Sequence, residues 1–212
     1  MKKIQDYNNA FDAILEFEEA LAKFTGAPYA VTTDCCTHAI EIALRLTYQK
    51  GIVKFPARTY LSVPMTLSKL DIPFEMVDEP WRNAYQFTNT KIWDSARAFS
   101  QNMYKKGQIQ CISFGRTKPM TLGRGGCLLT DNQELYQSAS RMRSDGRDLF
   151  QFSLWSDQQF FNEGYHYWMR PEDCVIGLNV LSQRTFTEQI EEFYNYPDCR
   201  KLRIVKYKKI EI

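Results

Sequence analysis

The chain has 212 residues, a length that allows one large domain or a domain with a small appendage. Hydrophobic residues make up 44% of the sequence and aromatic residues 14%, a composition that provides a proper core and argues against disorder. The 27 basic and 25 acidic residues leave a net charge of +2, so there is no electrostatic case for nucleic acid as a partner.

The first 80 residues alternate between helix and strand patterns. Residues 9–24 have apolar positions at three- and four-residue spacing, which indicates an amphipathic helix that stops at Gly26. The elements expected after it are a strand at 29–33, a helix at 38–46, a strand at 52–55, a helix at 61–70 and a strand at 73–77. This alternation predicts an α/β domain with three αβα layers and a mostly parallel sheet.

The second half of the chain begins with an irregular link at 79–91. The elements expected after it are strands at 92–94, 110–114 and 126–130, and a helix at 132–143. We expect Asp131 to cap that helix. Residues 144–170 are aromatic and loop-like, and a helix is predicted over 171–196 because Pro-Glu-Asp is a good helix start. The basic run at 200–209 is expected to be a tail or a strand with one solvated, charged face.

No segment of the sequence is suited to a membrane, and the cysteines indicate a reducing compartment. The N-terminus lacks an apolar signal core, and no apolar run approaches the roughly 20 residues that span a bilayer. None of the six cysteines shows CxxC or CxxH spacing, so we expect no metal site. Cys111 and Cys127 lie in apolar strand patterns and are expected to be buried. We therefore expect a cytoplasmic protein with no membrane partner.

Polar and reactive side chains gather where the predicted strands end, which is where parallel sheets bind ligands. Lys118 follows a strand and precedes a glycine-rich segment, so its amine could form a Schiff base if the surroundings lower its proton affinity. Taken alone, a surface lysine before a turn is the simpler interpretation. Ser113, in front of this loop, could add a hydroxyl group.

Three more features lie past strand ends. Residues 33–38 lead into a helix, whose free N–H groups could bind phosphate. Taken alone, the segment is better explained as an ordinary helix capped by Thr37 or Asp34, because it has no glycine that lets a ligand approach closely. Tyr60 could stack on an aromatic ring or pack in the core. Asp94 could pair with a protonated ring nitrogen or cap a turn. Together these are the parts that a pyridoxal phosphate (PLP) site requires.

Six segments, in this order, resemble the DegT/DnrJ/EryC1/StrS family of sugar aminotransferases, which have the type I fold of PLP enzymes. They are Phe17-Glu-Glu-Ala-Leu-Ala-Lys-Phe-Thr-Gly26, Cys35-Cys-Thr-His-Ala-Ile-Glu-Ile-Ala-Leu44, Pro56-Ala-Arg-Thr-Tyr60, Trp93-Asp-Ser-Ala-Arg97, Ser113-Phe-Gly-Arg-Thr-Lys118 with Gly123-Arg-Gly-Gly126, and Gly164-Tyr-His-Tyr-Trp-Met169. The resemblance implies a reduced large domain at 1–182 and a remnant C-terminal segment at 183–212, with the small domain largely missing.

The resemblance also implies roles for individual residues. Lys118 would be the Schiff-base lysine and proton shuttle, Asp94 the partner of the pyridinium nitrogen, and Tyr60 the aromatic residue that stacks on the ring. The residues that would hold the phosphate are Cys36, Thr37 and Ser113. His166 stands where the family has an asparagine that reaches the phosphate of the neighbouring subunit, which implies a homodimer with shared active sites.

Four positions depart from the family pattern. Cys36 replaces a glycine or alanine, Arg97 a glutamine or histidine, Arg124 a glutamate, and His166 the asparagine. Arg97 is included among the cofactor-binding residues. Arg97, Arg116 and Arg124 could hold a substrate carboxylate or diphosphate, or be solvated loop charges.

The resemblance implies an aminotransferase that moves an amino group from an amino acid, expected to be glutamate, to a keto-sugar, expected to be nucleotide-linked. The alternative is a reduced, non-catalytic homologue that binds PLP or a sugar nucleotide, or that serves as a subunit or scaffold. The losses relative to the family pattern at 78–92 and after 182 motivate this alternative.

Overall fold

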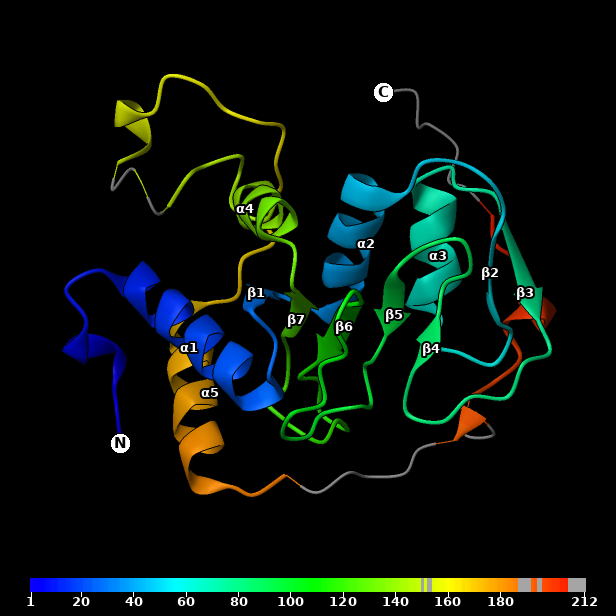
Figure 1. Ribbon diagram of the computed structural model, residues 1–212, viewed down its shortest axis with the longest axis horizontal. Helices are drawn as coiled ribbons and strands as arrows, with labels where there is room; N and C mark the ends of the chain where they lie inside the picture. Colours follow the sequence, from blue (N-terminus) through cyan, green and yellow to red (C-terminus); the bar gives the residue numbers. More distant parts are fainter. Residues whose placement is uncertain (150, 152–153, 187–191, 194–195, 206–212) are drawn as a thin grey trace, which may run out of the picture.

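The computed structural model describes residues 1–149, 151, 154–186, 192–193 and 196–205. Five strands form one sheet in the order β1-β7-β6-β5-β4, and a separate pair, β2 and β3, lies beyond β4 (Figure 1). The strands are β1 (Tyr29–Thr33), β2 (Val53–Pro56), β3 (Phe74–Val77), β4 (Tyr85–Gln86), β5 (Ile92–Asp94), β6 (Ile109–Ser113) and β7 (Gly126–Thr130).

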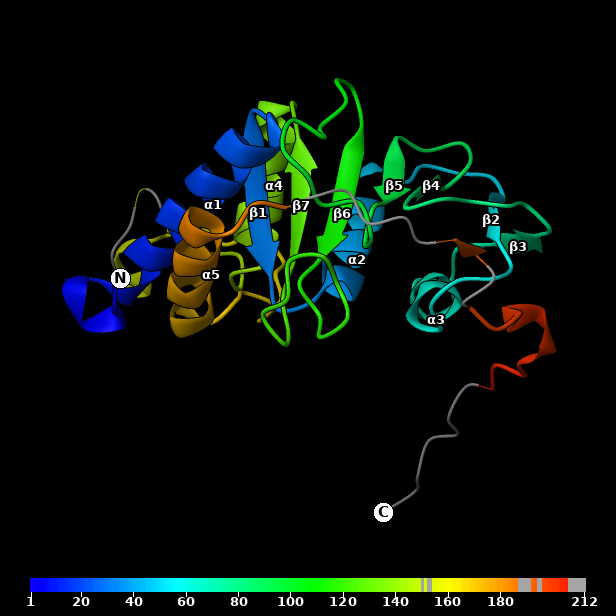
Figure 2. The same ribbon diagram turned by 90° about the horizontal axis from the view of Figure 1, so that it is seen from below.

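Helices lie on both faces of the five-stranded sheet, which confirms the α/β prediction (Figures 1 and 2). The helices are α1 (Ala10–Thr25), α2 (Cys36–Thr47), α3 (Ser62–Lys69), α4 (Gln133–Met142) and α5 (Pro171–Gln183). Alternate residues of β7 belong to two separate cores: Leu128 packs in the core under α2 and α4, while Cys127 and Leu129 pack in the core under α1 and α5.

The sheet is mixed, whereas the sequence analysis expected a mostly parallel one. β5 and β6 pair in parallel, but β7 is antiparallel to both β1 and β6, and β4 is antiparallel to β5. The loop between β6 and β7 contains no helix, and a chain that returns without a crossover helix pairs antiparallel. β1, β5 and β6 still point in one direction, so their carboxyl ends meet at one edge of the sheet.

Several helix ends differ from the predicted ones. α2 starts at Cys36, two residues before the expected start. The cap of α4 is Asn132, whose side chain accepts a hydrogen bond from the N–H of Leu135; Asp131 instead accepts one from the N–H of Gly107. α5 ends at Gln183 rather than at 196, because the chain turns away and Phe186 packs against aromatic rings near α1. Gly26, in the left-handed conformation, ends α1 as predicted.

Two expectations for individual segments also need adjustment. The link at 79–91 contains the short strand β4, so it is not wholly irregular. The basic run begins in a 3-10 helix, Cys199–Lys201, and its residues beyond 205 lie outside the described part of the chain.

All six cysteines are free, and Cys111 and Cys127 are fully buried as expected. No helix among the described residues is long and apolar enough to cross a membrane.

A buried ion pair connects α1, β1 and the end of α4. Glu18 of α1 accepts hydrogen bonds from the N–H and the hydroxyl of Thr32, at 2.6 and 2.9 Å. Arg143 donates to the Glu18 carboxylate and, at 2.7 Å, to the carbonyl of Thr32. Because α1 and α4 lie on opposite faces of the sheet, this pair fixes both helices to its edge strand.

Part of the C-terminal segment returns to the small sheet. The N–H of Cys199 donates to the carbonyl of Ala57 at 2.8 Å, and the Arg58 guanidinium donates to the carbonyl of Tyr196 at 3.1 Å. Trp81 packs on the Tyr196 ring with 5.3 Å between ring centroids. These contacts bring Tyr196 to the edge of the sheet where β1, β5 and β6 end.

Candidate active site

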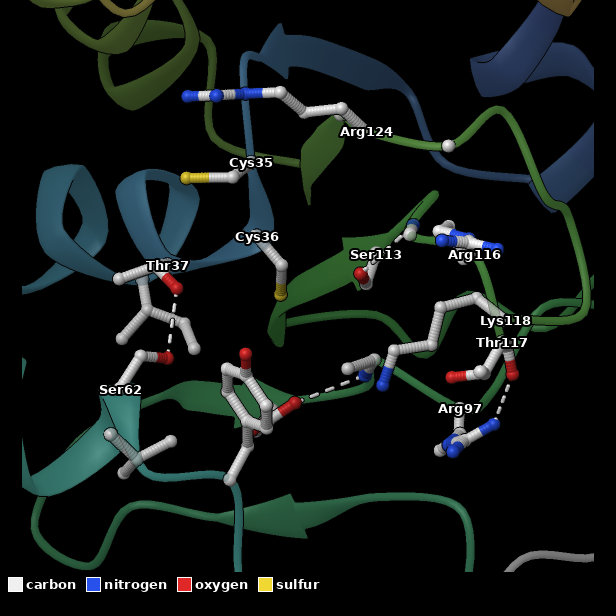
Figure 3. Close-up of a pocket in the computed structure, with 18 of the residues that line it drawn as sticks. Cys35, Cys36, Thr37, Ser62, Arg97, Ser113, Arg116, Thr117, Lys118 and Arg124 are labelled. Carbon is white, nitrogen blue, oxygen red and sulfur yellow. Dashed lines mark hydrogen bonds between the residues drawn. The ribbon is translucent and has the colours of Figure 1, made fainter.

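A pocket of about 530 Å³ lies where β1, β5 and β6 end (Figure 3). Its volume is in the range of about 300–1,000 Å³ that is usual for small-molecule sites. Seven of the eight residues predicted from the sequence line it: Cys36, Thr37, Tyr60, Asp94, Arg97, Ser113 and Lys118. The structure therefore brings together side chains from four segments that are far apart in the sequence.

The start of α2 forms one wall of the pocket. The helix has Cys35 at its N-cap position with no side-chain cap, so the alternative in which Thr37 or Asp34 caps it is wrong. The first turn of a helix leaves N–H groups without intrahelical partners and carries partial positive charge. The hydroxyl of Thr37 donates to that of Ser62 at 2.8 Å, and Ser113 lies across from them. This wall is suited to bind an anion such as phosphate.

Gly126 allows β7 to pass directly beside the start of α2. A Cβ atom at this position would lie 2.3 Å from the backbone nitrogen of Cys36. Only glycine permits such a close backbone approach. The glycine-rich segment after Lys118 therefore has a packing function in addition to forming the loop.

Asp94 presents a buried carboxylate at the end of β5. Its side chain accepts hydrogen bonds from the Tyr85 hydroxyl at 2.8 Å and from the Ala96 N–H at 3.0 Å. Burial raises the pKa of Asp94, while these two hydrogen bonds and the charge of Lys118 oppose the rise. The residue thus caps a turn and also lines the pocket, so the two sequence interpretations are compatible. A cation inside the pocket would stabilise the ionised carboxylate.

Lys118 extends from the β6–β7 loop into the pocket (Figure 3). The loop is held by a hydrogen bond from the Lys118 N–H to the carbonyl of Gly115 at 3.0 Å, and by one from the Thr121 hydroxyl to the Lys118 carbonyl at 2.6 Å. The side chain is half-buried, unlike that of a lysine on a solvated helix face. The simpler interpretation of Lys118 as a surface lysine is therefore wrong.

Three arginines add positive charge to the pocket. Arg97 donates to the Tyr196 hydroxyl at 3.1 Å and to the carbonyl of Thr117, so it connects the C-terminal segment to the lysine loop. Arg124 donates to the Asp34 carboxylate at 2.7 Å. Arg116 also lines the pocket. Together with Lys118, these groups favour anionic ligands.

Asp34 and His38 form an ion pair beside the start of α2. The Nδ1 atom of His38 lies 2.5 Å from Oδ1 of Asp34, and the imidazole stacks on Tyr167 with 3.6 Å between ring centroids. Partial burial lowers the pKa of His38, but hydrogen bonds with Asp34 and Cys35 outweigh this effect and raise it from 6.5 to about 9. The imidazole is therefore positively charged at neutral pH.

His166 is the one predicted site residue that the structure does not bring to this pocket. It lines a neighbouring hollow of about 680 Å³, and residues 123–125 form a wall that this hollow shares with the first pocket. The His166 ring is exposed and lies 2.9 Å from the Asp145 carboxylate. Its expected contact with a neighbouring subunit stays a prediction.

Sequence analysis missed two tyrosines of the site. Tyr85 lies in the link that was expected to be irregular; alternation of Tyr85 and Phe87 with polar residues could have indicated a short strand. Tyr196 belongs to the segment expected to be a remnant, and no local pattern marks it as a pocket residue.

An α/β fold with a lysine, a buried carboxylate and a helix start around one pocket is characteristic of PLP-dependent enzymes of fold type I. The DegT/DnrJ/EryC1/StrS aminotransferase family model matches residues 3–79 and 90–194, and the chain belongs to this family. The family is PLP-dependent and acts in sugar biosynthesis.

The similar proteins are longer than this chain. A UDP-4-amino-4,6-dideoxy-N-acetyl-beta-L-altrosamine transaminase of Campylobacter jejuni is 30% identical over 119 residues, which are 52% of this chain and 31% of that protein. The structure of AtS13 from Actinomadura melliaura superposes with a TM-score of 0.69 and 20% identity, covering 81% of this chain and 60% of that one. Helicobacter pylori PseC, an aminotransferase involved in pseudoaminic acid biosynthesis, gives a TM-score of 0.62 and 18% identity over 81% of this chain and 57% of its own. These two structures establish the shared fold.

Proposed function

We propose that the protein is a PLP-dependent aminotransferase whose catalytic residues are Lys118 and Asp94. The observation that carries the proposal is the buried Asp94 carboxylate in the same pocket as the half-buried Lys118 amine. A carboxylate in this environment needs a cationic partner, and a protonated ring nitrogen is such a partner. Few other uses of the pocket would require both groups.

The residues present fit the cofactor, which supplies an aldehyde and an electron-accepting ring when it is bound. Asp94 would keep the ring nitrogen protonated, and Tyr60 would lie against the ring. Thr37, Ser113 and the first N–H groups of α2 would hold the phosphate. Cys36 is compatible with a phosphate ligand, because burial and the charge of Asp94 raise its pKa well above the ordinary value and keep the thiol neutral.

Lys118 would hold the aldehyde and, once released from it, carry protons to and from the substrate. The half-buried position of the amine and its place in the pocket support this double role. Arg97 is a cofactor-binding candidate at the rim of the pocket, where its guanidinium also reaches the lysine loop through Thr117.

The substrates we propose are an amino acid donor, glutamate, and a nucleotide-linked keto-sugar. Arg116 and Arg124 are available at the pocket to bind the donor carboxylate or a diphosphate. The Campylobacter jejuni relative is a transaminase of a UDP-linked sugar, which supports the acceptor class.

We also propose a cytoplasmic homodimer in which His166 faces the phosphate of the neighbouring subunit. The exposed position of His166, next to the shared wall 123–125, supports this arrangement. The six free cysteines are typical of a reducing compartment.

The test begins with PLP added to the purified protein, followed by borohydride reduction and peptide mass spectrometry. We expect a pyridoxyl group on Lys118, no adduct in Lys118→Arg, and an undiminished adduct in Lys91→Arg, which replaces an exposed lysine elsewhere. In a separate sample that has not been reduced, adding glutamate should convert the bound cofactor to its amine form, as seen by absorbance. An adduct without conversion by any amino donor would favour the non-catalytic alternative. The absence of an adduct would overturn the aminotransferase proposal and any alternative that binds PLP through Lys118.

A further inference from the structure

Cys35 occupies a position that none of the proposed catalytic steps uses. It is the N-cap residue of α2, it is half-buried, and its side chain lines the pocket. In Figure 3 the Cys35 side chain extends in the same direction as that of Arg124, whereas Cys36 points toward the centre of the pocket. The two neighbouring thiols therefore have different environments.

Three side chains gather at this position: the Cys35 thiol, a histidine, and a carboxylate that orients the histidine. The ligand atoms of Asp34, Cys35 and His38 all lie within 4.8 Å of one another. Asp34 holds one ring nitrogen of His38 at 2.5 Å, and Tyr167 stacks on the ring, so the imidazole has a fixed orientation. A thiol, a histidine and a carboxylate that orients the histidine are the arrangement that activates cysteine nucleophiles.

Positive charge lies near this sulfur on two elements, α2 and the β6–β7 loop. His38, on the first turn of α2, is protonated at neutral pH. Arg124, on the β6–β7 loop, pairs with the other oxygen of Asp34. The partial charge at the start of α2 has the same sign. These charges lie beside a half-buried sulfur that small reagents can reach, which favours reaction with electrophiles and oxidants.

The other cysteines lack this environment. Cys36 is 9% exposed, and Cys111, Cys127, Cys174 and Cys199 are at most 1% exposed. Burial raises the pKa of all five thiols. These cysteines serve as internal controls for the reactivity of Cys35.

We propose that Cys35 is a reactive thiol, activated by the His38–Asp34 pair, which hydrogen peroxide oxidises to a sulfenic acid. The sulfur attacks one peroxide oxygen and the O–O bond breaks. The hydroxide that leaves takes the thiol proton and becomes water, so sulfur is oxidised by two electrons and the peroxide is reduced. A free thiol such as glutathione reverses the modification through a mixed disulfide.

Oxidation at this position affects the anion-binding wall of the pocket. The sulfenic acid stands at the N-cap of the helix whose first N–H groups face the pocket. This consequence rests on the proposed function: oxidised protein should retain less PLP than reduced protein. The reactivity of the thiol itself requires no cofactor.

The experiment treats the full chain, without PLP and with a chelator present, with hydrogen peroxide and a sulfenic-acid trap. Peptide mass spectrometry then gives the labelling rate of each cysteine. We expect Cys35 to be labelled at least about tenfold faster than the other five, since only its sulfur is both accessible and next to His38 and Asp34. His38→Gln should slow labelling of Cys35 several-fold, and Lys50→Gln, which removes an exposed charge beyond the far end of α2, should not.

Arg124→Gln provides a second variant whose side chain is exposed, so that it tests the charge environment even if His38→Gln does not fold. It should also slow the labelling of Cys35. Equal labelling of Cys35 and the buried cysteines would overturn the proposal, as would an unchanged Cys35 rate in folded His38→Gln and in Arg124→Gln. Because PLP is absent throughout, a failure here is distinct from a failure to form the Lys118 adduct.

Discussion

The ion pair between Glu18 and Arg143 is a point where one substitution should strongly destabilise the fold. Arg143→Met keeps a long side chain but removes the guanidinium that neutralises Glu18. Glu18 is 3% exposed and Arg143 is 1% exposed, so water cannot replace the lost partner. Breaking a buried pair in this way costs about 3–5 kcal/mol. The Thr32 carbonyl also loses a donor, which places the expected loss in the upper part of that range.

This loss is a large fraction of the stability of an ordinary domain, which is about 5–15 kcal/mol. For a domain of about 150–250 residues, each kcal/mol lowers the melting temperature by about 2–4 °C, so Arg143→Met should lower it by about 6–20 °C. Urea denaturation followed by circular dichroism gives the free energy of unfolding directly, and a thermal scan gives the melting temperature.

Arg141→Met is the matched control for this prediction. Arg141 also pairs with a carboxylate, Asp148, but the Arg141 side chain is 38% exposed, and the 11% exposed Asp148 side chain keeps a hydrogen bond from the Gln151 N–H. Partly exposed pairs contribute about 0–1 kcal/mol, so this variant should stay close to the parent. Equal losses in Arg141→Met and Arg143→Met would refute the reasoning from burial. The double variant Glu18→Leu/Arg143→Met should recover part of the loss, because no uncompensated charge remains buried.

Three further predictions concern the site. Tyr85→Phe removes a hydrogen bond of about 1.5–3 kcal/mol from the Asp94 carboxylate, so the pKa of Asp94 should rise further. Carboxyl-carbon NMR measures this pKa, and an unchanged titration of Asp94 would show that the hydrogen bond contributes nothing. Gly126→Ala should cost about 1–3 kcal/mol in urea denaturation, because its Cβ would lie 2.3 Å from a backbone nitrogen of α2; parental stability would contradict that close approach. The pKa of His38 rises on folding from 6.5 to about 9, so its contribution to stability should be fully present below pH 6.5 and lost as the pH rises to about 9. Urea midpoints across this range should fall in the parent and change less in His38→Gln; parallel profiles would exclude His38 as the cause.

Local patterns were sufficient to predict the strands of the described structure except β4, but not their directions. The apolar runs at 29–33, 92–94 and 126–130 are strands with the predicted bounds. The direction of pairing depends on contacts between distant segments: Tyr29 lies opposite Thr130, about a hundred residues away in the chain. No periodicity within either segment contains that information. The cap at Asn132 instead of Asp131 is a smaller error of the same origin, since Asp131 binds Gly107 from another loop.

The sequence could predict those residues of the site that lie at or just after the ends of predicted strands. Asp94 and Ser113 are last residues of strands, and strands that point in one direction bring such residues to one edge. Tyr85 and Tyr196 could not be found in this way. Tyr85 reaches Asp94 from an antiparallel edge strand, and Tyr196 arrives through backbone contacts between the C-terminal segment and residues 57–58.

The net charge of +2 does not decide which small ligands the protein can bind, because a net charge does not show where the charged side chains lie. Lys118, Arg97, Arg116 and Arg124 all line one pocket, and the start of α2 adds positive potential to the same space. The buried acid at that edge, Asp94, is positioned to pair with a cation inside the pocket. A ligand that fits this distribution is anionic at its ends and carries a protonated nitrogen between them. PLP together with an acidic substrate satisfies both conditions, whereas a polyanion such as nucleic acid satisfies only the first.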